Sequence, residues 1–570
     1  MNRKAFLILL SVISAVLILI MCLSPRSEQA EEKSPLPEVR ETAPVFAVVE
    51  GGAASQRISP YFKDEEAYFF LPAFADRKKL TLGTADGARV VLNGQEIGSS
   101  YVMDAGSLPG DLEIYRGDSC EKYTLNCMWS EKVPAVFIET GSGDMTAVDS
   151  DKEVVDEGRY TVIDGSGHTD GQGSLDFIHA RGNSSFQAEK KSYRIKLSEK
   201  DSLLGLPSDR SFILQANAYD NTDIRNALAF SLAEKWGMDF IPRYVQTDLY
   251  LNGGYAGAYT LMESIKVTPE RINIAGDGGY LFEVVHDEKR LDDDSFAFMC
   301  GGEVHLRVLY PEKLTASEKQ YTESHMNRIN DMIEGLGKDE STAELENYLD
   351  LDSFARMYLF NFVTNDIDAG NYSSYLYIDP ADKKVHLGPV WDYDKAWGNE
   401  YKKNGLPEFN SYSYRWPEIL SDNREMKERI RLCYEGVSPV TDMMRAEGIL
   451  GLADEVRESA AMDRVRWGNL SSQSVDTGSF DTDVEQLAGY YGDRVSLLED
   501  VLYKDDLCKV FIKGPSGRLF WVKKGEGLSK EQLDFARKLF GSDKFFLPSG
   551  EEVDETAVFV EDTVIKPENM

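Results

Sequence analysis

A helix, a polar loop and a β-hairpin follow one another in the middle of this chain, and this order constrains the fold more than any other feature. Apolar residues at helical spacing predict a helix with one buried face: Leu351, Phe354, Tyr358 and Phe362. The segment 365–371, Asn-Asp-Ile-Asp-Ala-Gly-Asn, ends this helix because Asn, Asp and Gly favour loops. Residues 374–378 and 385–391 then predict the two arms of a hairpin, since the Asp-Pro-Ala-Asp between them is a turn sequence.

This hairpin is expected to bring two aspartates together. Asp368 precedes the first arm and Asp392 follows the second, so antiparallel pairing makes them neighbours. One carboxylate can then orient an acceptor hydroxyl and take its proton. The other, with Asn371 or Ser373 nearby and Asp394 two residues on, can hold Mg²⁺ on phosphate oxygens. A single loop aspartate is more often a turn-former or a cap, so the prediction of phosphoryl transfer depends on the whole ordered set.

A basic strand lies further towards the N-terminus. The turn Arg181-Gly182-Asn183-Ser184-Ser185 precedes residues 190–197, Lys-Lys-Ser-Tyr-Arg-Ile-Lys-Leu, in which apolar and basic side chains alternate. Turn amides, hydroxyls and basic groups of this kind suit phosphate oxygens. An exposed basic strand face also occurs without any ligand, so this motif alone predicts no site.

The strand is followed by a helix and a second hairpin. Helical periodicity extends from Ile224 to Trp236, with Gly237 as a stop signal. Residues 244–251 and 255–262 flank Asn-Gly-Gly, a strong hairpin signature, and the chain then reaches Glu263. This order is compatible with the amino-terminal lobe of a kinase, and with many other α+β domains.

Length and charge exclude some functions. The chain has 570 residues, which predicts several packed units. Its formal charge of −35 comes from 62 basic and 97 acidic side chains, so we expect no binding to nucleic acid.

The N-terminus is expected to enter a membrane. The uncharged run from Ala5 to Leu23 follows Asn2-Arg3-Lys4 and has about the 20 residues that a membrane-spanning helix needs. We predict residues 1–23 to be a signal peptide or a transmembrane anchor, with the anchor favoured because no clear cleavage site follows. The Glu-, Pro- and Ser-rich segment 24–43 is predicted to be a disordered linker. The remainder would be extracytoplasmic, anchored to the cell membrane or secreted.

Three further units are predicted from pattern. Short β-rich runs separated by turns indicate a small all-β sandwich over residues 44–130. Amphipathic patterns predict helices within 315–336, 416–452 and 484–502. Residues 508–570 predict a small α/β appendage with an acidic tail.

Several motifs in one order resemble the spore coat protein H (CotH) kinase family. They are Arg181-Gly182-Asn183-Ser184-Ser185 with 190–197, Asp223-Ile224-Arg225-Asn226, the segment 254–263 (Gly-Tyr-Ala-Gly-Ala-Tyr-Thr-Leu-Met-Glu), and 388–394 (Gly-Pro-Val-Trp-Asp-Tyr-Asp). The resemblance covers roughly residues 134–399. It implies a divergent bilobal protein-kinase-like domain at 134–505, with an N-lobe to about 275, ATP and Mg²⁺ or Mn²⁺ as cofactors, and Ser or Thr of proteins as acceptors.

The resemblance also implies roles for individual residues. Asp368 would be the catalytic acid and Asp392 the metal ligand. Lys196, or else Lys191, would bind phosphate, and two residues of the turn would line it: Arg181 and Ser184. Glu263 ends a strand where the family keeps an acid, with its role left open.

The departures from ordinary kinases are large. The chain has no Gly-rich phosphate loop and no His-Arg before Asp368, and its metal motif is Asp-Tyr-Asp. The alternative to an active Ser/Thr kinase acting on surface or envelope proteins is a cell-surface or spore-coat structural or adhesion protein that keeps the fold without catalysis.

Overall fold

The computed structural model describes residues 43–568 apart from 53, 86, 118, 286–294, 303, 401–404, 411–414, 469–473 and 514–517. Its contacts divide the chain into two compact units, Met1–Glu38 and Val39–Met570. The predicted membrane segment 1–23 lies outside the described residues, as does the predicted linker 24–43 except for its last residue. Among the residues that are described, we find no helix with the length and apolar character needed to cross a bilayer.

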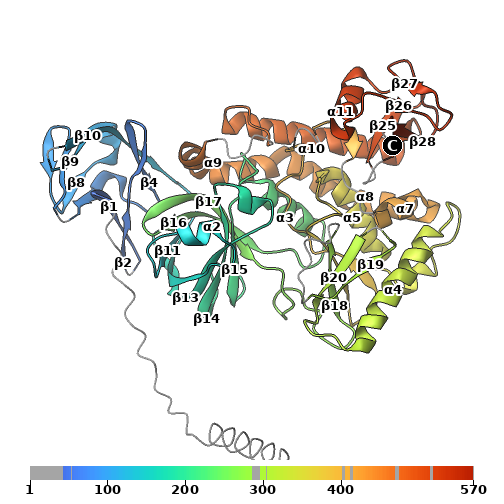
Figure 1. Cartoon of the computed structure of the whole chain (residues 1–570), viewed down its shortest axis with the longest axis horizontal. Coiled ribbons are helices and arrows are strands. Elements are labelled where there is room, and N and C mark those ends of the chain that lie inside the picture. Colours follow the sequence, from blue (N-terminus) through green and yellow to red (C-terminus); the bar gives the residue numbers. More distant parts are fainter. Residues whose placement is uncertain are drawn as a thin grey trace, which may run out of the picture. The chain divides into compact units, whose positions relative to one another are not determined.

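The first part of the second unit is a pair of sheets around one core (Figure 1). The first sheet has the order β2-β1-β5-β8: Ala54–Ile58, Val45–Gly51, Leu80–Thr84 and Tyr101–Met103. The second has the order β3-β4-β10-β9-β6-β7: Tyr61–Lys63, Glu66–Leu71, Ser119–Trp129, Gly110–Arg116, Arg89–Leu92 and Gln95–Ile97. Alternate residues of both sheets fill the space between them, which is the packing of a β-sandwich.

The next seven strands close into a barrel. In barrel order they are β11 Ala135–Thr140, β12 Asp156–Ile163, β13 Thr169–Arg181, β14 Ser192–Asp201, β15 Asp209–Gln215, β17 Gly254–Glu263 and β16 Tyr244–Leu251. Parallel pairing of β11 with β16 closes the barrel. The predicted hairpin is β16 and β17, and the predicted helix is α3, Arg225–Lys235.

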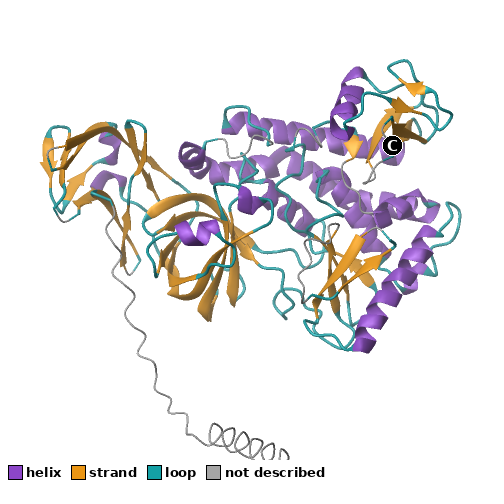
Figure 2. Cartoon of the chain, viewed as in Figure 1, coloured by secondary structure: helices purple, strands orange, loops and turns teal. Residues whose placement is uncertain are grey.

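A five-stranded sheet and a set of long helices follow (Figure 2). The sheet has the order β19-β20-β18-β21-β22: Ala297–Cys300, Val304–Tyr310, Tyr280–Val285, Ser374–Ile378 and Val385–Leu387. The helices are α4 Ala316–Glu334, α5 Leu351–Thr364, α7 Arg415–Asp422, α8 Arg424–Met443, the π-turn Met444–Gly448, α9 Ile449–Trp467 and α10 Phe480–Tyr503. Short helices are α2 Thr146–Ser150 and the 3₁₀ turns Arg77–Lys79, Ala105–Ser107, Ser185–Gln187 and Leu345–Asn347.

The C-terminal residues form a mixed sheet with one helix. Its order is β23-β25-β24-β28-β26-β27: Phe409–Asn410, Arg518–Lys523, Leu507–Ile512, Thr563–Pro567, Phe545–Phe546 and Glu552–Val553, with α11 at Lys530–Phe540. One strand, β23, comes from a distant part of the chain, and Leu519 and Trp521 of β25 belong to the core of the helical region. The appendage therefore shares a sheet and a core with the preceding region.

A buried ion pair joins the barrel to the helices. The Nζ of Lys190 lies 2.7 Å from Oδ1 of Asp463 on α9, and the side chain of Lys190 is fully buried. Lys190 also donates to the carbonyl oxygen of Ala258 at 2.7 Å. Gly257 makes this approach possible, because its φ is +129° and a Cβ there would lie 2.3 Å from Oδ1 of Asp463.

Candidate active site

The loop after α5 positions Asp368 through its neighbour Asp366. Asn365 caps α5 with a left-handed φ of 47°, a conformation that asparagine tolerates. Oδ1 of Asp366 then accepts hydrogen bonds from the backbone N–H groups of Asp368 at 2.8 Å and Ala369 at 3.1 Å. This Asx turn fixes the direction in which Asp368 leaves the backbone.

The predicted hairpin carries Asp392 to the same place. β21 and β22 pair antiparallel, with Leu376 opposite Leu387. The second arm is shorter than the predicted 385–391, because β22 ends at Leu387 and Pro389 has no N–H to offer a ladder. Ser373 just before β21 donates its hydroxyl to Oδ2 of Asp392 at 3.1 Å, which joins the two ends of the hairpin.

Four carboxyls gather here, and we call Asp366, Asp368, Asp392 and Asp394 the acid cluster. Asp366 and Asp394 are buried, and the other two are partly buried. Burial raises the pKa of Asp366 and of Asp394 well above the usual range, and the neighbouring acids raise both further. Burial also raises the pKa of Asp392, although the Arg181 guanidinium opposes this shift.

Two cations face the acid cluster. Lys395 donates to Oδ2 of Asp368 at 3.1 Å, and the acids around Lys395 raise its pKa even though burial lowers it. Arg181, at the end of β13, lies with its guanidinium carbon 5.7 Å from the ring centre of Trp391 and donates to Oε1 of Gln215 at 3.0 Å. Lys395 and Arg181 therefore stabilise the ionised forms of Asp368 and Asp392.

The turn that contains Ser184 approaches the same cations. The Tyr219 hydroxyl donates to the carbonyl oxygen of Ser184 at 2.8 Å, and the ammonium of Lys395 lies 5.7 Å from the Tyr219 ring centre. Gly182 has a φ of +103°, and a Cβ there would meet Oγ of Ser185 at 2.0 Å, so the tight turn requires glycine. The structure thus places Arg181 beside Trp391, next to Asp392 of the acid cluster, whereas Ser184 contacts Tyr219.

The two predicted phosphate-binding lysines contact other groups. Lys191 donates to two carbonyl oxygens of its own turn, those of Phe186 and Ala188, both at 2.7 Å. Lys196 is 42% exposed, and its Nζ lies 4.0 Å from Oδ2 of Asp176 on the neighbouring strand β13. Their proposed role in binding the cofactor stays a prediction.

Glu263 also lies in a different environment. Its Oε2 accepts from the backbone N–H of Arg243 at 2.8 Å, and its Oε1 lies 3.5 Å from Nε of Arg271. It lines a separate cavity of about 310 Å³ with Pro242 and Arg271 among the walls. Asn371, by contrast, is within the site: it is buried, and its N–H donates to the carbonyl oxygen of Asp368 at 3.0 Å.

Helix α3 fastens the barrel to the loop that carries Asp392. Nε of Arg225 donates to the carbonyl oxygen of Ala396 at 3.1 Å, and Oδ1 of Asn226 accepts from the N–H of Tyr393 at 2.7 Å. The side chains of Arg225 and Asn226 are both buried. Their place in the motif 223–226 is therefore explained by docking onto the loop that carries Asp392.

Sequence reasoning missed Lys395, which directly follows the motif 391–394. The number of acids in this segment could have indicated it, because a cluster of buried carboxyls requires a nearby cation or a metal ion. The donor set fits Mg²⁺: carboxylate oxygens predominate, and Oδ2 of Asp366 is buried without a hydrogen-bond partner in the described part of the chain.

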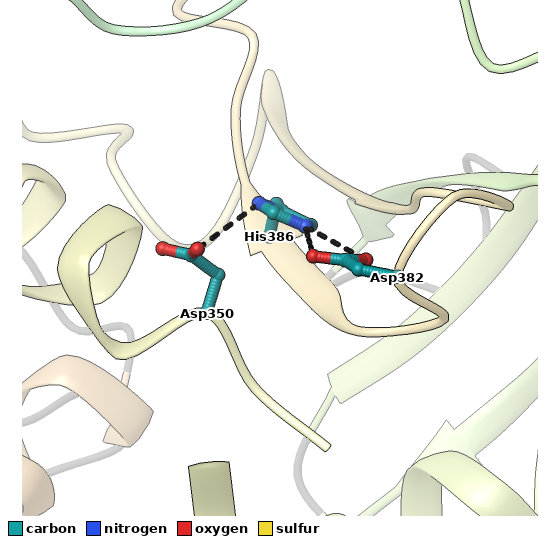
Figure 3. A group of neighbouring side chains, drawn as sticks. All are labelled: Asp350, Asp382 and His386. Atoms are coloured by element: carbon teal, nitrogen blue, oxygen red, sulfur yellow. Dashed lines mark hydrogen bonds and ion pairs between the residues drawn. The ribbon is translucent and has the colours of Figure 1, made fainter. Parts of the chain in front are cut away.

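A second acidic cluster lies at the opposite end of the hairpin (Figure 3). Nε2 of His386 lies 3.1 Å from Oδ2 of Asp382, and its Nδ1 lies 3.9 Å from Oδ2 of Asp350. The two ring nitrogens face different carboxylates, so His386 lies between Asp350 and Asp382. Because Asp350 also caps α5 through the N–H of Ser353 at 2.6 Å, we interpret this group as a fastening between α5 and the hairpin turn.

One family of known proteins matches this chain. The chain matches the CotH kinase protein family over residues 178–498, which is more than half of its length. It belongs to the CotH kinase family. The CotH kinase match includes the acid cluster, Arg181 and Lys395, whereas the β-sandwich and the appendage strands β24 to β28 lie outside it.

A crystal structure of the Helicobacter pylori proinflammatory kinase CtkA is similar to 54% of this chain and to 92% of its own, with 9% sequence identity and a TM-score of 0.21. A score this low defines no shared fold, so the family assignment depends on the sequence match. The comparison with curated proteins found no match.

Proposed function

We propose that this protein is an atypical Ser/Thr protein kinase that transfers the γ-phosphoryl group of ATP to surface or envelope proteins in an Mg²⁺-dependent reaction. One observation carries the proposal: Asp368, held by Lys395, lies in the same acid cluster as Asp392, held by Ser373. A proton acceptor and a metal ligand at the two ends of one hairpin are the groups that phosphoryl transfer requires.

In this proposal Asp368 orients the acceptor hydroxyl and takes its proton. The acceptor oxygen forms a bond to the γ-phosphorus while the bond to the bridging oxygen breaks, so that ADP leaves. Lys395 keeps the Asp368 carboxylate in place for this step, and Arg181 with the turn 182–187 binds phosphate oxygens. Asp392, Asp394 and Asn371 would hold Mg²⁺ or Mn²⁺, which supplies positive charge to the phosphates.

The family membership supports a kinase with a protein substrate, and the bilobal kinase-like arrangement is part of the proposal. The barrel with α3 would be the amino-terminal lobe, and the sheet with α4 to α10 the carboxy-terminal lobe. The apolar run in residues 5–23 supports an extracytoplasmic location, either anchored or secreted.

The test uses the full chain with Mg²⁺ or Mn²⁺, an unfolded Ser- and Thr-rich acceptor protein, and ATP labelled on the γ-phosphate. We expect label on Ser or Thr and a loss of about 10²–10⁴-fold in Asp368→Asn. In Asp392→Asn we expect lower activity and a higher Mg²⁺ concentration at half-maximal activity. Asp493→Asn on the exposed face of α10 is the control. A parallel reaction uses ATP labelled on the α-phosphate, and protein label in this reaction alone would indicate transfer of AMP. Nucleotide binding without any transfer would favour the inactive structural protein.

A further inference from the structure

Strand β25 of the appendage lies outside the family match, yet it is linked through β23 to the end of α5, from which the loop to Asp368 begins. Its residues Leu519 and Phe520 pair with Asn410 and Phe409 of β23. The first residue of β25 is Arg518, which therefore lies one step beyond this pair.

The partner strand β23 is in turn fixed to the end of α5. Nδ2 of Asn365 donates to the carbonyl oxygen of Phe409 at 2.7 Å, and Nη2 of Arg494 donates to Oδ1 of Asn410 at 2.8 Å. Asn365 is the residue from which the loop to Asp368 begins. The start of β25 is thus held against the segment that carries the proposed catalytic acid.

Arg518 presents an unpaired group at this position. Its Nη1 is buried and has no hydrogen-bond partner within the residues that the structure describes. Burial lowers the pKa of Arg518 to about 10, while the charges of Asp368 and Glu400 oppose this shift. Since Asp368 already binds Lys395, the guanidinium has donors left for an anion beside that carboxylate.

We propose that Arg518 is a further catalytic residue, whose guanidinium binds the phosphoryl group as it passes from ATP to the acceptor at Asp368. The inference rests on the proposed function. A planar fork of donors matches two phosphoryl oxygens, and the Nη1 group of Arg518 is already withdrawn from water, so it can meet the charge that spreads over them during transfer. The appendage then completes an active site whose other residues come from the family domain.

The test compares Arg518→Gln with Lys523→Gln, which removes an exposed cation from the other end of the same strand. In the full chain we expect Arg518→Gln to lower kcat about 100-fold or more and to weaken binding of Mg·ATP about tenfold, with Mg·ADP binding unchanged. Lys523→Gln should leave all three unchanged. Arg518→Lys, which keeps the charge and loses the fork, should lose about tenfold in kcat and guards against a folding defect in the glutamine variant.

Two results would overturn the inference while leaving the kinase proposal intact. One is unchanged kcat and ATP affinity in Arg518→Gln. The other is faster transfer by Arg518→Gln, which would show that Arg518 inhibits the reaction. If the wild type binds Mg·ATP without transferring it, the proposed function fails, and the affinity of Arg518→Gln for Mg·ATP against Mg·ADP still decides whether the guanidinium meets the terminal phosphate. Binding of neither nucleotide to the wild type would overturn both.

Discussion

Lys190 and Asp463 form an ion pair at 2.7 Å with no solvent access to the lysine side chain, and the pair joins the barrel to α9. Removing one partner leaves a buried charge without compensation, which costs about 3–5 kcal/mol. We therefore expect Lys190→Met to lower the free energy of unfolding by that amount in urea titrations. Lys200→Met, at an exposed position of β14, the strand that follows Lys190, should change it little, and equal midpoints for the two variants would contradict the prediction.

Gly257 tests the same junction without removing a charge. Alanine there combines a φ of +129° with a Cβ 2.3 Å from Oδ1 of Asp463, so we expect a loss of about 2–4 kcal/mol. In Gly451→Ala on α9 the new methyl group meets nothing within 4 Å, and the helix should gain about 0.5–1 kcal/mol. Thermal unfolding of the two variants should shift in opposite directions.

Asp248 predicts a dependence of stability on pH. Burial raises its pKa to about 7, whereas the unfolded chain has about 3.9. Protonation of Asp248 therefore contributes fully to the stability of the folded state below the unfolded pKa of about 3.9. This contribution decreases as the pH rises and is lost once the pH passes the folded pKa of about 7. As the pH rises from about 5.5 to about 8.5, the wild type should therefore lose about 2 kcal/mol of stability relative to Asp248→Asn.

The measurement is the urea midpoint of both proteins across that range, with Asp493→Asn as a control on an exposed helix face. The amide can still accept from the hydroxyl of Tyr255, which lies 3.0 Å from Oδ1 of Asp248. A difference between Asp248→Asn and the wild type that does not change with pH would show that the carboxyl titrates normally.

The proposed role of Arg181 in binding phosphate can be tested by measuring nucleotide affinity. Because Arg181 faces Asp392, we expect Arg181→Gln to raise the Kd of Mg·ATP about tenfold. Because Lys196 pairs with Asp176, we expect Lys196→Gln to change this Kd less than about twofold. Calorimetric titration of both variants measures this. A larger effect in Lys196→Gln would assign phosphate binding to the lysine after all.

The hairpin from Ser374 to Leu387 could be predicted because its turn and its alternation are local. The closure of the barrel could not, since β11 and β16 pair across more than a hundred residues that carry no mark of their partner. For the same reason the sequence assigned residues 508–570 to an appendage without showing that β23 at 409–410 extends its sheet.

The lysines show the same limit at the level of single residues. Alternation correctly placed Arg194 and Lys196 on one face of β14. Which groups that face meets depends on register, and Phe177 beside Asp176 proved to lie opposite Lys196. The burial of Lys190 depends on a helix that begins far downstream at Ile449.

The sheet that contains β25 depends on a strand in its interior. β28, at Thr563–Pro567, pairs with β24 on one side and with β26 on the other, so it joins the two parts of this sheet. A variant without residues 563–567 would keep every family motif but would leave one edge of β24 unpaired. Because an unpaired strand edge can pair with other chains, we expect such a variant to aggregate.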